Sequence, residues 1–159
     1  MPSTSTTPSA PMPAPTSTPS SSWEAARPRH HGTHLTADLA GCAASHPWMT
    51  QPDTLRAACL QAVARVGLQT VGERFHGFEP AQGHQTAGVT GVVLLAESHL
   101  AVHTWPELGV VTLDVFVCNL LSDNAERAQM LLDQLVAGFE PQQQARQAIR
   151  RAIPDAAST

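Results

Sequence analysis

The chain contains no lysine and no tyrosine among its 159 residues. Without lysine, Schiff-base chemistry on a protein amine is excluded, and so is the internal aldimine that holds pyridoxal phosphate. A Walker A loop, whose lysine reaches the phosphates, is excluded too. Without tyrosine, no phenol can serve as an acid or a base. Any catalysis must therefore use Ser, Cys, His, Asp or Glu, or a group made from one of them.

Cysteine and basic charge are also scarce. The 3 cysteines show no Cys-x-x-Cys spacing, and an odd number without an export signal indicates free thiols rather than a disulfide framework. All 9 basic residues are arginines, and the formal net charge is -4. Because no basic stripe is interleaved with aromatic residues, nucleic acid is not an expected partner.

No long hydrophobic run is present. The longest falls well short of the ~18–20 apolar residues that span a bilayer, so we expect a soluble protein without a membrane partner. Residues 1–29 are rich in Ser, Thr and Pro and are predicted to form a disordered tail. The tail has neither the basic start nor the apolar core of a signal peptide, so we expect a cytoplasmic location.

Residues 30–159 predict one domain of the α+β class. Strands are expected at 34–42, 68–78, 89–96, 98–105 and 110–118, and helices at 53–67 and 122–139. The segments 45–52 and 79–88 are expected as loops, and the residues after Pro141 suit either a helix or a final strand. Asp53 is expected to cap the first helix, and Asp123 to cap the second.

These elements predict a two-layer α/β sandwich. Two helices on one face of an antiparallel-rich sheet bury that face and leave the other uncovered. The simplest cover for the second face is another copy of the chain. We therefore expect a homodimer whose sheets face each other or abut.

A polar cluster interrupts the most apolar part of the chain. Glu97, Ser98 and His99 directly follow the uncharged run at 91–96. Burying an unpaired charge costs several kcal/mol or shifts its pKa, so this cluster needs a partner network, a ligand or a chemical event.

The residues themselves leave several interpretations of the cluster open. His99 and His103 share a strand face and, with Cys118 or Glu107, could make a zinc site. Ser98 beside a histidine could be a hydrolase nucleophile, although no Gly-x-Ser-x-Gly elbow surrounds it. Cys118 could equally be a buried apolar thiol.

A family resemblance narrows this choice. Residues 88–119, "GVTGVVLLAESHLAVHTWPELGVVTLDVFVCN", closely resemble the core of the prokaryotic S-adenosylmethionine decarboxylases. The segment "HLTADLAGC" resembles the first strand of that family, and the similarity extends over about residues 30–150. Glu-Ser-His followed by His-Thr-Trp-Pro-Glu and a downstream Cys is a specific combination. In this family the chain cuts itself between the Glu and the Ser.

The resemblance implies self-cleavage between Glu97 and Ser98, giving a β chain, 1–97, and an α chain, 98–159. Ser98 would become a pyruvoyl group that forms a Schiff base with the substrate amine, and no pyridoxal phosphate would be needed. This fits the lack of lysine, because a ketone can act as the electron sink for decarboxylation. His103 matches the histidine that carries a proton in processing. Thr90 matches a serine whose hydroxyl supports the cyclic intermediate.

The resemblance also implies roles in turnover. Cys118 matches a thiol proposed as the general acid that reprotonates the substrate α-carbon. Phe78 matches an aromatic residue that stacks on adenine, and Glu107 a carboxylate that accepts ribose hydroxyls. Leu100 is expected beside them as a third substrate-binding residue. No metal is expected.

The chain departs from the family pattern near the substrate. The loop between "FEP" and "GVTG" is longer than usual, Leu108 replaces a frequent aromatic residue, and Val117 and Asn119 replace a frequent Thr and Gly around Cys118. The expected function is decarboxylation of S-adenosylmethionine for spermidine and polyamine biosynthesis. The alternatives are the same chemistry on ornithine or arginine, an uncleaved non-catalytic partner subunit, and a zinc-binding protein.

Overall fold

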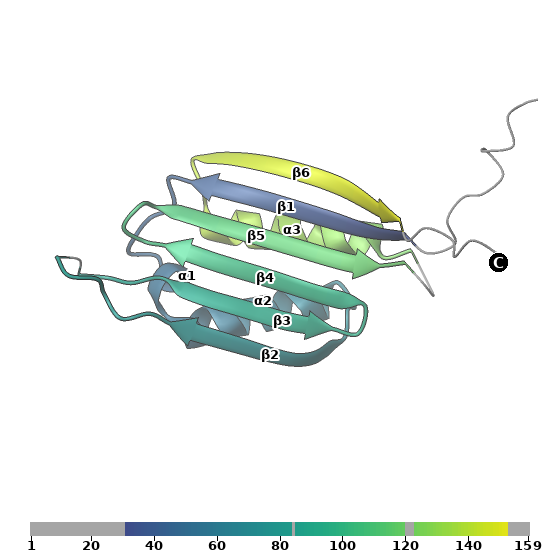
Figure 1. The fold of residues 1–159 in the computed structure, drawn as a ribbon, viewed down its shortest axis with the longest axis horizontal. Coiled ribbons are helices and arrows are strands. Elements are labelled where there is room, and N and C mark those ends of the chain that lie inside the picture. Colours follow the sequence, from purple (N-terminus) through teal and green to yellow (C-terminus); the bar gives the residue numbers. More distant parts are fainter. Residues whose placement is uncertain (1–30, 84, 120–122, 153–159) are drawn as a thin grey trace, which may run out of the picture.

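Six antiparallel strands form one sheet in the computed structural model, which describes residues 31–83, 85–119 and 123–152. The strand order is β2-β3-β4-β5-β1-β6 (Figure 1). The strands are β1 (His31–Ala40), β2 (Thr70–Gly77), β3 (Val89–Leu95), β4 (Ser98–Trp105), β5 (Val110–Cys118) and β6 (Gln143–Ala152). The helices are α1 (Pro47–Thr50), α2 (Pro52–Arg65) and α3 (Ala125–Phe139).

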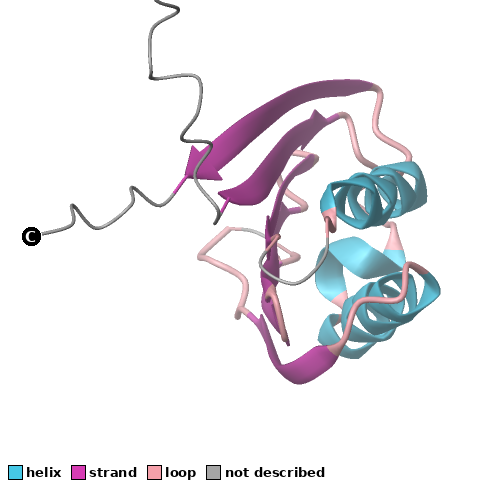
Figure 2. Cartoon of the chain, turned by 90° about the vertical axis from the view of Figure 1, so that its right-hand side faces the viewer, coloured by secondary structure: helices cyan, strands magenta, loops and turns pink. Residues whose placement is uncertain are grey.

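The helices all lie against one face of the sheet, and the other face is uncovered (Figure 2). This is the predicted two-layer α+β arrangement, and the prediction is confirmed. The predicted tail, residues 1–29, lies outside the described residues. Within the part that the structure describes, no helix is long and apolar enough to cross a membrane.

Alternation along the central strands decides which side chains enter the core. In β4, Leu100 and Val102 are fully buried beneath the helices, whereas His99 and His103 point to the uncovered face. β5 alternates in the same way. One face of the sheet is therefore apolar and packed, and the other carries most of the chemically reactive side chains.

The two long helices supply the other half of the core. α3 buries Ala128, Leu131, Leu132, Leu135, Val136 and Phe139, and α2 buries Leu55, Cys59, Ala62 and Val63. Their spacing follows the helical repeat, so each helix turns one apolar stripe to the sheet. Each fully buried leucine contributes about 1.5–3 kcal/mol to the free energy of unfolding. This packing holds β4 and β5 in place from behind.

Several local predictions are wrong in detail. The segment 45–52 contains the short helix α1, which begins with Pro47 and is capped by the His46 side chain accepting from the Trp48 N–H. Gln51, not Asp53, is the N-cap of α2, because Pro52 already occupies the first helical turn. In α3 the N-cap is Asn124, one residue after the predicted Asp123.

The segment after Pro141 is a strand. β6 pairs with β1 along ten residues, from Gln143↔Ala40 to Ala152↔His31. Every residue of β6 is exposed, so no buried stripe marks it in the sequence. Backbone pairing with β1 and an ion pair between Arg146 and Asp133 of α3 hold it at the edge of the sheet.

Candidate active site

The Glu97–Ser98 peptide bond lies where the turn after β3 meets the first residue of β4. The Glu97 carbonyl oxygen accepts a hydrogen bond of 3.0 Å from the backbone N–H of Cys118, at the end of β5. This contact polarises the carbonyl that a neighbouring hydroxyl would attack. The same N–H is placed to stabilise negative charge that develops on that oxygen.

The carboxylate of Glu97 is also in an unusual setting. Its Oε2 atom is buried and takes no hydrogen bond from any described residue. The backbones of Glu97 and Cys118 thus meet at the Ser98 end of β4, beside an unpartnered carboxylate oxygen.

A second group of predicted residues lies at the other end of β4. Thr90 of β3 pairs directly with His103 of β4, and the Thr90 Oγ1 atom is 2.8 Å from the His103 Nδ1 atom. Trp105 packs beside the same imidazole, with ring centroids 6.1 Å apart. These contacts hold the His103 ring on the uncovered face of the sheet.

The two groups do not meet within one chain. Ser98 and His103 are five residues apart on one continuous strand, which separates them by about 16 Å at ~3.3 Å per residue. Direct proton transfer needs about 3 Å between heavy atoms. His103 therefore cannot act on Ser98 of its own chain in this structure.

The same spacing argues against the zinc interpretation. His99 and His103 share a face but are about 13 Å apart along β4, too far to ligate one ion. Across the described residues, no group of three or more His, Cys, Asp or Glu side chains is placed to hold a metal ion.

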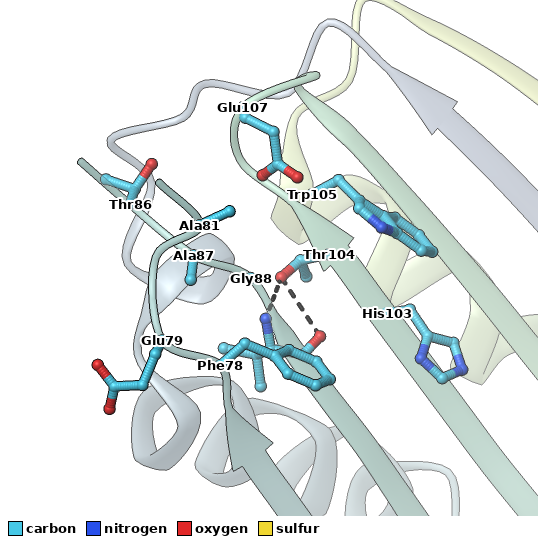
Figure 3. Close-up of a pocket in the computed structure, with 11 residues that line it drawn as sticks. Phe78, Glu79, Ala81, Thr86, Ala87, Gly88, His103, Thr104, Trp105 and Glu107 are labelled. Atoms are coloured by element: carbon cyan, nitrogen blue, oxygen red, sulfur yellow. Dashed lines mark hydrogen bonds between the residues drawn. The ribbon is translucent and has the colours of Figure 1, made fainter. Parts of the chain in front are cut away.

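A cavity of about 360 Å³ lies beside the Thr90–His103 pair. Figure 3 shows Phe78, His103, Trp105 and Glu107 around it, with Glu79, Ala81 and residues 86–88 forming one wall. Phe78 is 55% exposed, so one face of its ring is free to contact a ligand. The cavity therefore combines aromatic surface with a carboxylate, as a site for a planar base and vicinal hydroxyls requires.

The backbone around the cavity is tightly built. The Thr104 hydroxyl donates to the Met49 carbonyl at 2.7 Å and accepts from the Val89 N–H at 2.8 Å, tying β3 and β4 to α1. A Cβ atom at Gly88 would lie 1.8 Å from the Thr104 carbonyl oxygen. Only glycine allows the loop to enter β3 at this point.

Leu100 does not belong to the cavity. Its side chain is fully buried between the sheet and the helices, because it alternates with His99 and faces the core. The prediction that Leu100 binds substrate is therefore corrected, and it is a packing residue.

The three thiols differ in environment. Burial raises the pKa of Cys59 to about 12 and also raises the pKa of Cys42, so both stay protonated at neutral pH. Cys118 is only partly buried, and its backbone N–H contacts the carbonyl of Glu97, the residue before Ser98. It is the most accessible of the three thiols.

The uncovered face also carries residues that sequence reasoning missed. Asp114 of β5 lies between His34 of β1 and His99 of β4, with His34 Nε2 2.7 Å from Asp114 Oδ2 and His99 Nε2 3.4 Å from Asp114 Oδ1. Period-two alternation in "VTLDVFVC" puts Asp114 on the face of Cys118, which was the available signal. The partner His34 is 80 residues away in the chain and could not be assigned.

Comparison with known proteins identifies the family of the chain. The profile of the family described as S-adenosylmethionine decarboxylase matches residues 33–152. The S-adenosylmethionine decarboxylase proenzyme of Aquifex aeolicus is 33% identical over 122 residues, which are 77% of this chain and 82% of that protein. The proenzyme of Pyrococcus abyssi is 34% identical over 108 residues, which are 68% of this chain and 72% of that protein.

A solved structure shows the same fold. The crystal structure of the adenosylmethionine decarboxylase from Aquifex aeolicus matches with a TM-score of 0.66 and 32% identity, covering 80% of this chain and 96% of that chain. The predicted family and the decarboxylase class that goes with it are confirmed. The chain belongs to the S-adenosylmethionine decarboxylase family.

Proposed function

We propose that this protein is a self-processing decarboxylase that converts S-adenosylmethionine to decarboxylated S-adenosylmethionine for polyamine biosynthesis. The observation that carries the proposal is the hydrogen bond from the Cys118 N–H to the Glu97 carbonyl, at the peptide bond that joins Glu97 to Ser98. A decarboxylase without lysine needs another source of a carbonyl cofactor, and Ser98 at this bond provides one.

The cleavage follows from this arrangement. The Ser98 hydroxyl attacks the Glu97 carbonyl carbon, and the Cys118 N–H stabilises the resulting oxyanion. Collapse of the intermediate breaks the C–N bond and leaves an ester between Glu97 and Ser98. Removal of the Ser98 α-proton then eliminates the Glu97 carboxylate, and hydrolysis of the dehydroalanine releases ammonia. The new chains are 1–97 and 98–159, the second beginning with a pyruvoyl group.

The pyruvoyl ketone supplies an electron sink that stabilises the carbanion left by decarboxylation. Cys118, whose backbone N–H contacts the Glu97 carbonyl, delivers a proton to the substrate α-carbon as the general acid. Phe78 stacks on the adenine and Glu107 accepts hydrogen bonds from the ribose hydroxyls, and because their cavity lies at the His103 end of β4, it serves the Ser98 of the second protomer. The cavity that these two residues line supports a nucleoside substrate over a small basic amino acid.

A homodimer of processed protomers completes the site. His103 lies about 16 Å along β4 from the Ser98 of its own chain, so we assign the removal of the Ser98 α-proton, after the ester has formed, to the partner's His103 and the hydroxyl paired with it. The uncovered sheet face supports this arrangement because it exposes Leu94 and Ile149, at 48% and 47%, among its polar residues. Two sheets packed face to face would cover these side chains.

The free thiols suit a reducing compartment, and we propose the cytoplasm as the location.

Two measurements test the function. A denaturing mass measurement of the purified protein should give two chains, cut between Glu97 and Ser98, while Ser98→Ala stays as one folded, inactive chain. Release of carbon dioxide should be fastest from S-adenosylmethionine when ornithine and arginine are compared at equal concentration. An active wild-type preparation consisting of intact chain would refute the pyruvoyl cofactor, and faster turnover of ornithine or arginine would refute the substrate.

A further inference from the structure

A connected row of polar side chains leads from Ser98 across the uncovered face of the sheet. The Ser98 Oγ atom is 3.4 Å from the Nδ1 atom of His99. The Nε2 atom of the same imidazole is 3.4 Å from Asp114 Oδ1, and the other oxygen of that carboxylate is 2.7 Å from His34 Nε2. Hydroxyl, imidazole and carboxylate therefore follow one another, as in a nucleophile with its base and the group that orients the base.

The sheet holds this row in place around one aromatic ring. Phe116 lies between the two imidazoles, with ring centroids 5.6 Å from His34 and 5.9 Å from His99. Gly32 leaves room for the ring, because a Cβ atom there would lie 2.5 Å from a Phe116 ring carbon. The orientation of both histidines is thus restricted by packing as well as by Asp114.

The charge on Asp114 decides which nitrogen of His99 carries the proton. The contact between His99 Nε2 and Asp114 Oδ1 is an ion pair at 3.4 Å and not a hydrogen bond, since Oδ1 accepts none from the described residues, and the nearby negative charge favours the proton on Nε2 in the neutral ring. The Nδ1 atom that faces Ser98 is then an unprotonated acceptor. His34 uses its own Nε2–H on the second oxygen of Asp114, which fixes the plane of the carboxylate.

We propose that His99 is the base that takes the proton from the Ser98 hydroxyl in the first step of self-cleavage, and that Asp114 and His34 are its positioning residues. This inference rests on the proposed function and assigns a step that His103 of the same chain cannot perform. His103 lies at the opposite end of β4, about 16 Å from Ser98.

All bonds and protons of this step are accounted for by groups of the chain itself. The Ser98 Oγ–H bond breaks and the proton moves to His99 Nδ1, while the oxygen lone pair forms a bond to the Glu97 carbonyl carbon. The carbonyl electron pair moves onto the Glu97 oxygen, where the Cys118 N–H holds it. When the C–N bond breaks, the imidazolium returns its proton to the Ser98 nitrogen, and no further reactant is needed.

The other groups near His99 are few. Across β3 the residue opposite is the apolar Leu94, and on β5 it is Phe116. Arg151 of β6 stacks 4.4 Å from the centroid of the Phe116 ring, and Cys118 lies two residues further along β5. Asp114 and His34 are therefore the titratable groups placed to orient the imidazole, with Arg151 as the nearby fixed charge.

Timed cell-free synthesis of the full chain, followed by denaturing mass measurement, tests the proposal. His99→Gln should be cut about 10²–10⁴-fold more slowly than wild type, because a general base is lost. Asp114→Asn should also slow cleavage strongly, because its amide can donate to Nε2 and so favour the tautomer with the proton on Nδ1. Both variants should have the same melting temperature as the uncut Ser98→Ala chain, and this result would show that they are folded.

Hydroxylamine, which splits esters, locates the stalled step. The uncut His99→Gln chain should resist it, because no ester has formed, whereas the uncut His103→Ala chain should be split at residue 97. Asp114→Asn gives a second, nearly isosteric variant if His99→Gln does not fold.

Cleavage of folded His99→Gln within threefold of the wild-type rate would overturn the assignment. Splitting of the stalled His99→Gln chain by hydroxylamine would also overturn it, because His99 would then act after ester formation. A wild-type chain that is never cut contradicts the proposed function itself. If the wild type is cut and His99→Gln is cut at the same rate, only the assignment of His99 as the base is contradicted.

Discussion

Co-expression of two inactive variants tests whether two chains share each cleavage site. Ser98→Ala has no attacking hydroxyl, and His103→Ala has no imidazole to remove the α-proton, so neither should be cut when expressed alone. The structure separates Ser98 from His103 of the same chain by about 16 Å, against the ~3 Å that proton transfer needs. In a mixed dimer, the His103→Ala chain keeps Ser98 and its partner keeps His103.

The expected yield follows from symmetry. Equal amounts of two chains that pair at random place about half of the His103→Ala chains in mixed dimers. About half of those chains should therefore be cut between Glu97 and Ser98, and none of the Ser98→Ala chains. Differently tagged chains let a denaturing mass measurement count each population, and a native mass measurement counts the mixed dimers.

A matched control removes the His103 imidazole from both chains. Co-expression of His103→Ala with the double variant Ser98→Ala, His103→Ala supplies no imidazole at residue 103 in either chain, so no cleavage is expected. If mixed dimers of Ser98→Ala and His103→Ala form but contain only uncut chains, the two chains do not share a cleavage site. His103 would then act within its own chain, which requires a rearrangement of β4 that the present sheet does not allow.

Three further predictions concern turnover, the substrate and stability. Cys118→Ala should still be cut but should lose about 10²–10⁴-fold in turnover, because the proton donor is missing while the backbone N–H remains; unchanged carbon dioxide release would make the thiol a packing residue. Phe78→Ala should raise the KM for S-adenosylmethionine by about tenfold, as expected for the loss of ~1–1.5 kcal/mol of stacking, whereas Met130→Ala, an exposed residue of α3 outside the cavity lining, should leave the KM unchanged. Burial raises the Cys59 pKa from 9.0 to about 12, so the native state holds this proton more tightly than the unfolded state. The resulting stabilisation is complete below pH 9 and is lost as pH rises toward 12, so Cys59→Ala should flatten the alkaline fall in the free energy of unfolding measured in urea.

Local pattern was sufficient for most of the fold. Strict alternation in β4 and β5, and the apolar stripe of α3, place these elements because burial of one face contributes most to their stability. β6 has no such signal, since all ten of its residues are exposed. Its conformation depends on hydrogen bonds to β1, a partner about a hundred residues away in the chain, and only the assembled sheet decides it.

The chemistry of the site also depends partly on the sequence and partly on the tertiary structure. The sequence alone determined the residue types that are available: no lysine, a Glu97-Ser98 bond after an apolar run, and the motif that identifies the family. Only the tertiary structure decided which of them meet. Strand pairing brings the Cys118 N–H to the Glu97 carbonyl and Asp114 between two histidines, while the rise of an extended strand keeps His103 away from Ser98 of its own chain. Spacing in the sequence measures distance along one strand, whereas contacts between strands are set by the register of the sheet.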